Sequence, residues 1–195
     1  MIGIIDYGMG NLRSVQKAIE FLGGEAVISS EMRTLDGCER LILPGVGSFA
    51  AGMKNLTETG LADYVLRRIK DTPLLGICLG MQFLLSASEE EGEHAGLGLI
   101  KGRAARFTQG KIPHMGWNSA DDLSSPLFEG IMPGTQFYFV HSYYAQVEDA
   151  DAIAKTEYYV TFASAIGRGN AYGVQFHPEK SGAAGLQVLR NFMRL

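Results

Sequence analysis

The sequence has 195 residues, of which 46% are hydrophobic and 19% charged, and its formal net charge is −4. This length and composition indicate one globular domain with a sizeable core and exclude a disordered chain. The negative charge, together with the absence of any Lys/Arg run, argues against a nucleic-acid partner, and no apolar stretch reaches the roughly 18 residues that a membrane-spanning helix needs.

Short apolar runs alternate with helix-length segments in the first half of the chain. The runs predict strands, and the longer segments at residues 11–22 and 61–70 predict helices. Such alternation is typical of a parallel sheet covered by helices on both faces. The predicted strands of this half are residues 2–6, 26–29, 40–43 and 74–77.

The spacing changes beyond about residue 102, where short segments rich in β-branched and aromatic residues predict hairpins or mixed strands. Residues 181–194 predict a closing amphipathic helix. We therefore expect one three-layer α/β domain over residues 1–195, with a mostly parallel central sheet flanked by helices and an antiparallel or mixed elaboration in the second half. The strands expected in this half are residues 137–140, 143–147, 152–156 and 171–175.

Cys78 lies at the centre of the motif Gly-Ile-Cys-Leu-Gly, residues 76–80, between a predicted strand and a helix expected at residues 81–85. This is the pattern of a nucleophile elbow, in which glycines leave room for a sharp turn and the helix N-terminus favours a thiolate. The N–H group of Leu79 would then be an oxyanion donor. By itself the motif fits a buried structural cysteine equally well.

His177-Pro178-Glu179 follows the last predicted strand. Residues i and i+2 of an extended backbone face the same side, so we expect His177 and Glu179 to lie together. A carboxylate at one imidazole nitrogen leaves the other free to take a thiol proton. Alone, the tripeptide also fits a surface turn, but combined with a cysteine on an elbow it predicts a Cys78–His177–Glu179 triad.

Residues 44–47, Pro-Gly-Val-Gly, follow another predicted strand. Glycines let backbone N–H groups approach a ligand closely, so Val46 and Gly47 are further oxyanion candidates. An isolated motif of this kind also fits an ordinary strand-to-helix turn.

These three motifs, in this order, resemble the signatures of class I glutamine amidotransferases over essentially the whole chain. Four segments are similar, more narrowly, to the glutaminase subunits of imidazole glycerol phosphate synthase: residues 6–11, 113–118, 139–143 and 177–181. The resemblance implies hydrolysis of glutamine to glutamate and ammonia through a thioester on Cys78, with no metal or organic cofactor. The ammonia would serve the synthesis of imidazole glycerol phosphate in histidine biosynthesis.

The resemblance also implies a set of substrate contacts. Glu90 would receive the α-ammonium group of glutamine, although its acidic surroundings also fit a solvated loop, and a shift of one residue would replace it with Glu89. The implied substrate residues are Gly45, Gly47, Gln82, Glu90, His141, Ser142 and Tyr143.

The implied partner is a cyclase subunit with a (β/α)8-barrel fold, which would form a heterodimer with this chain and receive its ammonia. Lys180 is expected to pair with an acid of that partner, and Met115 and Trp117 have a competing explanation as core residues. The implied interface residues are Asn11, Met115, Trp117, Tyr138 and Lys180.

Three other functions are compatible with part of this pattern. A glutaminase for a different synthase would keep the triad, but residues 113–118 argue against it. A non-catalytic binding module would be expected to lack part of the triad, and a peptide hydrolase would lack Gln82. Cys38 has no neighbouring His, so we expect it to be inert, and two such sparse cysteines, with no signal-peptide pattern, predict a cytoplasmic protein.

Overall fold

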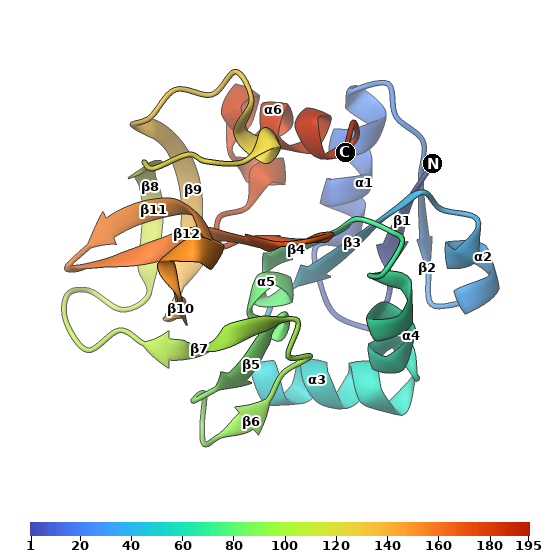
Figure 1. Cartoon of the computed structure of the whole chain (residues 1–195), viewed down its shortest axis with the longest axis horizontal. Helices are drawn as coiled ribbons and strands as arrows, with labels where there is room; N and C mark the ends of the chain where they lie inside the picture. The colour runs from blue at the N-terminus through green and yellow to red at the C-terminus, as the bar shows by residue number, and fades with distance from the viewer.

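A sheet of 11 strands runs through the computed structural model, which describes residues 1–195 (Figure 1). The chain forms these strands: β1 (Ile2–Ile5), β2 (Ala26–Ser29), β3 (Arg40–Gly45), β4 (Leu74–Cys78), β5 (Leu85–Ser88), β6 (His94–Ala95), β7 (Ile100–Arg106), β8 (His114–Ala120), β9 (Thr135–His141), β10 (Tyr143–Val147), β11 (Ala152–Tyr158), β12 (Val160–Arg168) and β13 (Ala171–Val174). The large sheet has the order β2-β1-β3-β4-β13-β12-β10-β7-β5-β6, with β11 paired to β12. Strands β8 and β9 form a separate antiparallel ribbon.

The half of the sheet from β2 to β13 is parallel throughout. Beyond β13 the pairings are antiparallel, except that β5 runs parallel to β7. The predicted α/β domain, with parallel strands in its first half and a mixed elaboration in its second, is therefore confirmed. The α-helices are α1 (Leu12–Phe21), α2 (Met32–Asp36), α3 (Phe49–Glu58), α4 (Leu61–Arg68), α5 (Leu79–Phe83) and α6 (Gly182–Phe192), and none is long and apolar enough to cross a membrane.

Two separate cores form on the two faces of the parallel strands, because alternate residues of a strand point to opposite faces. Ile42 and Leu75 pack on one face with residues of α1 and α6. Leu41 and Leu43 pack on the other face with residues of α2, α3 and α4. Figure 1 shows α1 and α6 on one side of the sheet and α3 and α4 on the other. This arrangement leaves the carboxyl ends of β3, β4 and β13 side by side at one edge.

The structure corrects several of the predicted elements. The helix expected at residues 81–85 begins earlier, at Leu79, and ends at Phe83, because β5 already begins at Leu85. The sequence pattern did not predict α2, α3, β5, β6, β7, β8 or β12. Strand β12 is rich in Ala, Ser and Gly, so its own propensity is weak, and its pairing with three other strands is what makes it a strand.

Candidate active site

Cys78 stands where β4 ends and α5 begins, with φ 54° and ψ −108°. A positive φ is strained for a residue with a side chain and persists only where the surroundings enforce it. Two glycines make this turn sterically possible. A Cβ atom on Gly76 would lie 2.5 Å from the carbonyl oxygen of Gly80, and one on Gly80 would lie 1.8 Å from that of Leu43. The backbone is therefore the elbow that the sequence predicted.

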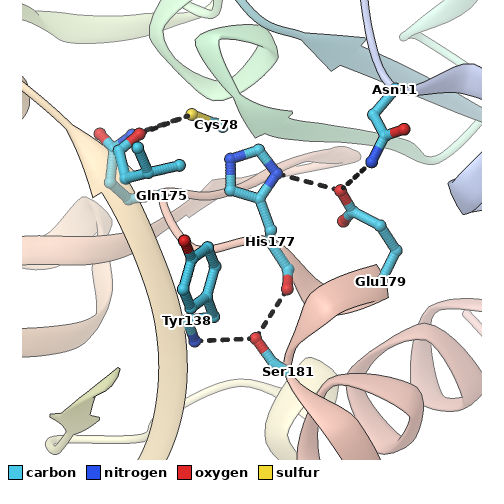
Figure 2. Close-up of polar contacts among 8 residues, drawn as sticks. Asn11, Cys78, Tyr138, Gln175, His177, Glu179 and Ser181 are labelled. Atoms are coloured by element: carbon cyan, nitrogen blue, oxygen red, sulfur yellow. Dashed lines mark hydrogen bonds and ion pairs between the residues drawn. The ribbon is translucent and has the colours of Figure 1, made fainter. Parts of the chain in front are cut away.

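His177 and Glu179 form a buried pair beside Cys78 (Figure 2). His177 Nδ1 lies 3.0 Å from Glu179 Oε1, and Asn11 Nδ2 donates to the same oxygen at 3.1 Å. The side chains of the pair are only 2% and 1% exposed. The backbone reason given for this proximity was wrong, because Pro178–Lys180 form a turn of 3-10 helix rather than extended chain, and this turn folds Glu179 back onto the imidazole.

The charges of this pair are set by their contacts rather than by burial. Burial acts to lower the pKa of His177, but its interactions with Cys78 and Glu179 raise this pKa to about 9. Burial acts to raise the pKa of Glu179, but hydrogen bonds from His177 and Asn11 hold it below its usual value. His177 Nε2 is buried without a hydrogen-bond partner. The imidazole therefore presents a free nitrogen in a setting that favours its protonated form.

The backbone of His177 is clamped to strand β9. Its N–H group donates to the carbonyl oxygen of Tyr138 at 2.9 Å, and its own carbonyl oxygen accepts from Ser181 Oγ at 2.6 Å. Ser181 Oγ in turn accepts from the N–H group of Tyr138 at 2.9 Å, which closes a ring; Figure 2 draws the two contacts that Ser181 makes in it. The sequence did not single out Ser181, whose only signal was its place in the motif that includes His177.

A cavity of about 360 Å³ lies above Cys78 at the carboxyl edge of the parallel strands. Ligands of open α/β sheets bind at this edge, and the volume is in the range of small-molecule sites. The protein offers no group of three or more His, Cys, Asp or Glu side chains that could hold a metal ion. The cavity is lined by Val46, Gly47, Cys78, Leu79, Gln82, Glu90, Pro113, Val140, His141, Ser142, Tyr143 and His177.

All but one of the predicted oxyanion and substrate residues line this cavity. The exception is Gly45, which makes room for α5, since a Cβ atom there would lie 2.6 Å from the backbone nitrogen of Gly80. Glu90 lies in the cavity wall, where Oε2 accepts from the N–H group of Phe49 at 2.6 Å. Glu89 is not part of the wall and accepts instead from the backbone of Arg106. Glu90 is thus the acidic residue that reaches the cavity.

Two buried histidines form a hydrogen-bonded chain behind the cavity wall. His141 Nδ1 donates to the carbonyl oxygen of Tyr143 at 2.8 Å, so its Nε2 accepts from His114 Nδ1 at 2.9 Å. Asn118 Nδ2 then donates to His114 Nε2 at 3.2 Å. Burial lowers the pKa of His114 to about 4 and that of His141 to about 3. Both rings are neutral at pH 7, so His141 offers the cavity a fixed dipole and no charge.

The predicted interface residues lie near the triad and mostly face solvent. Met115 and Trp117 alternate along β8 and are 61% and 56% exposed, so core packing does not account for them. The ring of Trp117 meets that of Tyr138 edge to face, with centroids 6.1 Å apart. Lys180 is exposed beside the triad, and Asn11 is half-buried because it is bonded to Glu179.

Comparisons with known proteins agree on one family. The model of the class-I glutamine amidotransferases matches residues 4–195. "Imidazole glycerol phosphate synthase subunit HisH" of Geobacillus thermodenitrificans is 51% identical over 203 residues, which cover 99% of this chain and 95% of the relative. The protein of the same name from Methanocaldococcus jannaschii is 48% identical, with 100% of both chains covered.

Solved structures show the same fold at lower identity. A crystal structure of a glutamine amidotransferase has a TM-score of 0.79 at 21% identity and covers 99% of this chain and 97% of its own. The structure of PurLQS from Thermotoga maritima has a TM-score of 0.78 at 20% identity, with 99% and 97% covered. Together with the sequence comparisons, these likenesses mean that the chain belongs to the class I glutamine amidotransferases and, within them, to the HisH glutaminase subunits of imidazole glycerol phosphate synthase.

Proposed function

We propose that Cys78, His177 and Glu179 carry out the glutamine hydrolysis of this family and that the ammonia passes to a (β/α)8-barrel cyclase subunit bound to this chain. The observation that carries the proposal is the alignment of the three groups. Cys78 is held at a strained elbow, and His177 presents a buried, unpartnered Nε2 to the same cavity. Glu179 occupies the other nitrogen of that ring at 3.0 Å.

The chemistry begins when the sulfur of Cys78, having given its proton to His177, attacks the side-chain amide carbon of glutamine. The carbonyl oxygen becomes an oxyanion, for which the N–H groups of Leu79, Val46 and Gly47 are the nearby donors. His177 returns its proton to the departing nitrogen, the C–N bond breaks, and ammonia leaves a γ-glutamyl thioester. Water then attacks the thioester while His177 takes its proton, and glutamate leaves as the C–S bond breaks.

Substrate recognition follows from the polarity of the cavity wall. Glu90 supplies the anionic group that binds the α-ammonium of glutamine. Its carboxylate lies at the N-terminal end of α3, where it accepts from the N–H group of Phe49. Ser142 and Tyr143 are further polar residues of the wall, and His141 holds the Tyr143 carbonyl in place at 2.8 Å. Gln82 also donates to that carbonyl, at 3.1 Å. A small amino acid amide therefore meets several polar groups in the wall of the cavity that holds Cys78.

The proposed docking surface consists of Asn11, Met115, Trp117, Tyr138 and Lys180. Exposed Met and Trp side chains are enriched in protein interfaces, which supports an interface here. The surface adjoins the triad, since the carbonyl oxygen of Tyr138 accepts from the N–H group of His177. Ammonia released at Cys78 would therefore leave near the partner. A cytoplasmic location is part of the proposal, supported by two free cysteines.

The experiment that tests the function is ammonia release from glutamine by the full chain, with and without the cyclase subunit and its ribonucleotide substrate. We expect stimulation by both additions and loss of activity in Cys78→Ser, whereas Cys38→Ser, the matched control, keeps it. Activity that is high in the chain alone and indifferent to the cyclase would refute the partner assignment. Absence of ammonia under every condition would refute the proposed catalytic role of the triad.

A second experiment tests the docking surface. Lys180→Glu places an acid where we propose that a partner acid binds, so we expect weaker binding to the cyclase subunit by titration calorimetry and lower coupled turnover. Lys70→Glu, an exposed lysine that precedes β4 at the opposite edge of the sheet, is the matched control and should change neither quantity. Unchanged affinity in Lys180→Glu would exclude this lysine from the interface.

A further inference from the structure

Gln175 is a fully buried polar residue that the triad chemistry does not use. It follows β13, between the apolar residues Val174 and Phe176, and its exposed fraction is 0%. The register of β13 against β4 pairs Val174 with Ile77, so the next residue lies beside Cys78. Gln175 Nε2 is 3.7 Å from Cys78 Sγ, the contact drawn in Figure 2. A buried amide between apolar residues needs hydrogen-bond partners within the protein.

The orientation of this amide is fixed by its neighbours. The carbonyl oxygen of Tyr143 can only accept, so Gln82 must turn its nitrogen toward it, at 3.1 Å. The same nitrogen donates to the side chain of Gln175 at 3.2 Å, which requires the oxygen of Gln175 on that side. The nitrogen of Gln175 is therefore left facing the sulfur. A flipped amide would place two NH2 groups against each other and leave the sulfur without this donor.

We propose that Gln175 is a catalytic residue whose amide N–H group donates a hydrogen bond to the Cys78 thiolate, with Gln82 as the positioning residue that orients it. The proposal rests on the proposed role of Cys78 as nucleophile. Gln175 and His177 are two residues apart in the segment that follows β13, and both side chains lie at the site of the sulfur: Gln175 Nε2 is 3.7 Å from Sγ, and His177 lines the same cavity as Cys78. The sulfur thus has Gln175 as a neutral donor and the ionisable ring of His177 in the same cavity.

The amide of Gln175 can donate to the sulfur in the steps in which His177 exchanges a proton with another atom. His177 gives its proton to the departing nitrogen when the thioester forms, and it holds the proton of the attacking water when the thioester breaks. In that second step the C–S bond electrons return to sulfur and Cys78 leaves as a thiolate. Gln175, which does not change protonation, stabilises that leaving group throughout the cycle.

The test is the pH dependence of alkylation of Cys78 by iodoacetamide in the free full-length chain, with Cys38 replaced by Ser so that only one thiol reacts. Gln175→Met keeps a similar volume without a donor, and we expect the midpoint of the alkylation profile to rise by about one pH unit or more, as for loss of a hydrogen bond to a charged group. At a pH well below the midpoint, where the thiolate is the minor form, this corresponds to roughly tenfold slower alkylation. Gln175→Glu, which places a carboxylate near the sulfur, should raise the midpoint further.

Two other variants separate this role from simple packing. Gln82→Met frees the Gln175 amide to rotate and should raise the midpoint by a smaller amount, even if Gln175→Met itself does not fold. Gln146→Met, at an exposed position on β10, should leave the midpoint unchanged. Folded Gln175 and Gln82 variants with the wild-type midpoint would overturn the proposal, whatever their turnover. The profile needs no glutamine, so it reports on Gln175 even if Cys78→Ser still releases ammonia and the proposed function fails.

Discussion

Glu179→Gln removes the negative charge beside His177 and keeps the geometry of the pair. The carboxylate uses only one oxygen, Oε1, which accepts from His177 Nδ1 at 3.0 Å and from Asn11 Nδ2 at 3.1 Å. The other oxygen, Oε2, is buried without a hydrogen-bond partner. A Gln amide can therefore keep both hydrogen bonds with its oxygen and place its NH2 group where Oε2 lies.

The size of the effect follows from the pKa of His177. The rise from 6.5 to about 9 corresponds to roughly 3 kcal/mol in favour of the imidazolium form, at about 1.4 kcal/mol per unit, shared between Cys78 and Glu179. Without the carboxylate, burial acts to lower this pKa. Since roughly 3 kcal/mol corresponds to a few hundredfold in rate, we expect glutamine turnover at neutral pH to fall by about 10- to 300-fold.

The assay is ammonia release from glutamine, coupled to glutamate dehydrogenase, from about pH 6 to about pH 10 with the cyclase subunit present. The acid limb of the profile should move to lower pH together with the fall in turnover. Glu20→Gln, an exposed acid on α1, is the matched control and should leave the profile unchanged. If the pH profile of Glu179→Gln equals that of the wild type, the carboxylate charge has no part in setting the pKa of His177, and the prediction is wrong.

Three further predictions concern stability. Gly80→Ala brings a Cβ atom to 1.8 Å from the Leu43 carbonyl oxygen, so thermal unfolding should show a large loss of Tm, whereas Gly37→Ala, with nothing nearer than 3.6 Å, should keep the wild-type Tm. Phe176→Ala removes a buried ring stacked at 4.1 Å on Phe137 and should lower the free energy of unfolding in urea by about 3–5 kcal/mol; a loss under about 1 kcal/mol would contradict this. His114 and His141 have depressed pKa values of about 4 and 3, so their contribution to stability is present above about pH 6.5 and is lost as the pH falls toward 4, by roughly 1.4 kcal/mol per pH unit for each ring. His177 contributes in the opposite sense, with stability lost as the pH rises from about 6.5 through about 9, so urea unfolding at about pH 6.5 and pH 5 reports mainly on the buried pair, and equal stability at both would contradict the neutral rings.

The sequence predicted the parallel strands well because each carries its own signal. Strands β1 and β4 are apolar along their whole length and β3 is apolar after Arg40, as is typical of strands buried on both faces. Strand β12 has no such signal, and it exists because β10, β11 and β13 pair with it. Strand β13 lies between β4 and β12 and pairs with β4, whose residues come 97 positions earlier (Ala171 pairs with Leu74), and no local pattern contains that information.

The site was predictable where a motif carries its own backbone geometry. The glycines around Cys78 specify the elbow, and His177 and Glu179 are close enough in sequence to meet through one turn. The remaining partners are set by tertiary structure. Asn11 reaches Glu179 from the other end of the chain. Gln175, which contacts Cys78, is visible in the sequence only as one polar residue between apolar ones, two positions before His177. This pattern could have indicated a functional residue, but we did not predict one there.

Cys78 carries the γ-glutamyl group in the proposed mechanism, so the decisive experiment is to trap that thioester. The full chain, alone and with the cyclase subunit, is mixed with isotope-labelled glutamine, quenched in acid within a single turnover, and digested for peptide mass spectrometry. We expect a label on the peptide that holds Cys78 and none on the peptide that holds Cys38. In the Cys78→Ser variant we expect no labelled peptide. A label on Cys38, or ammonia released by Cys78→Ser at the wild-type rate, would contradict it.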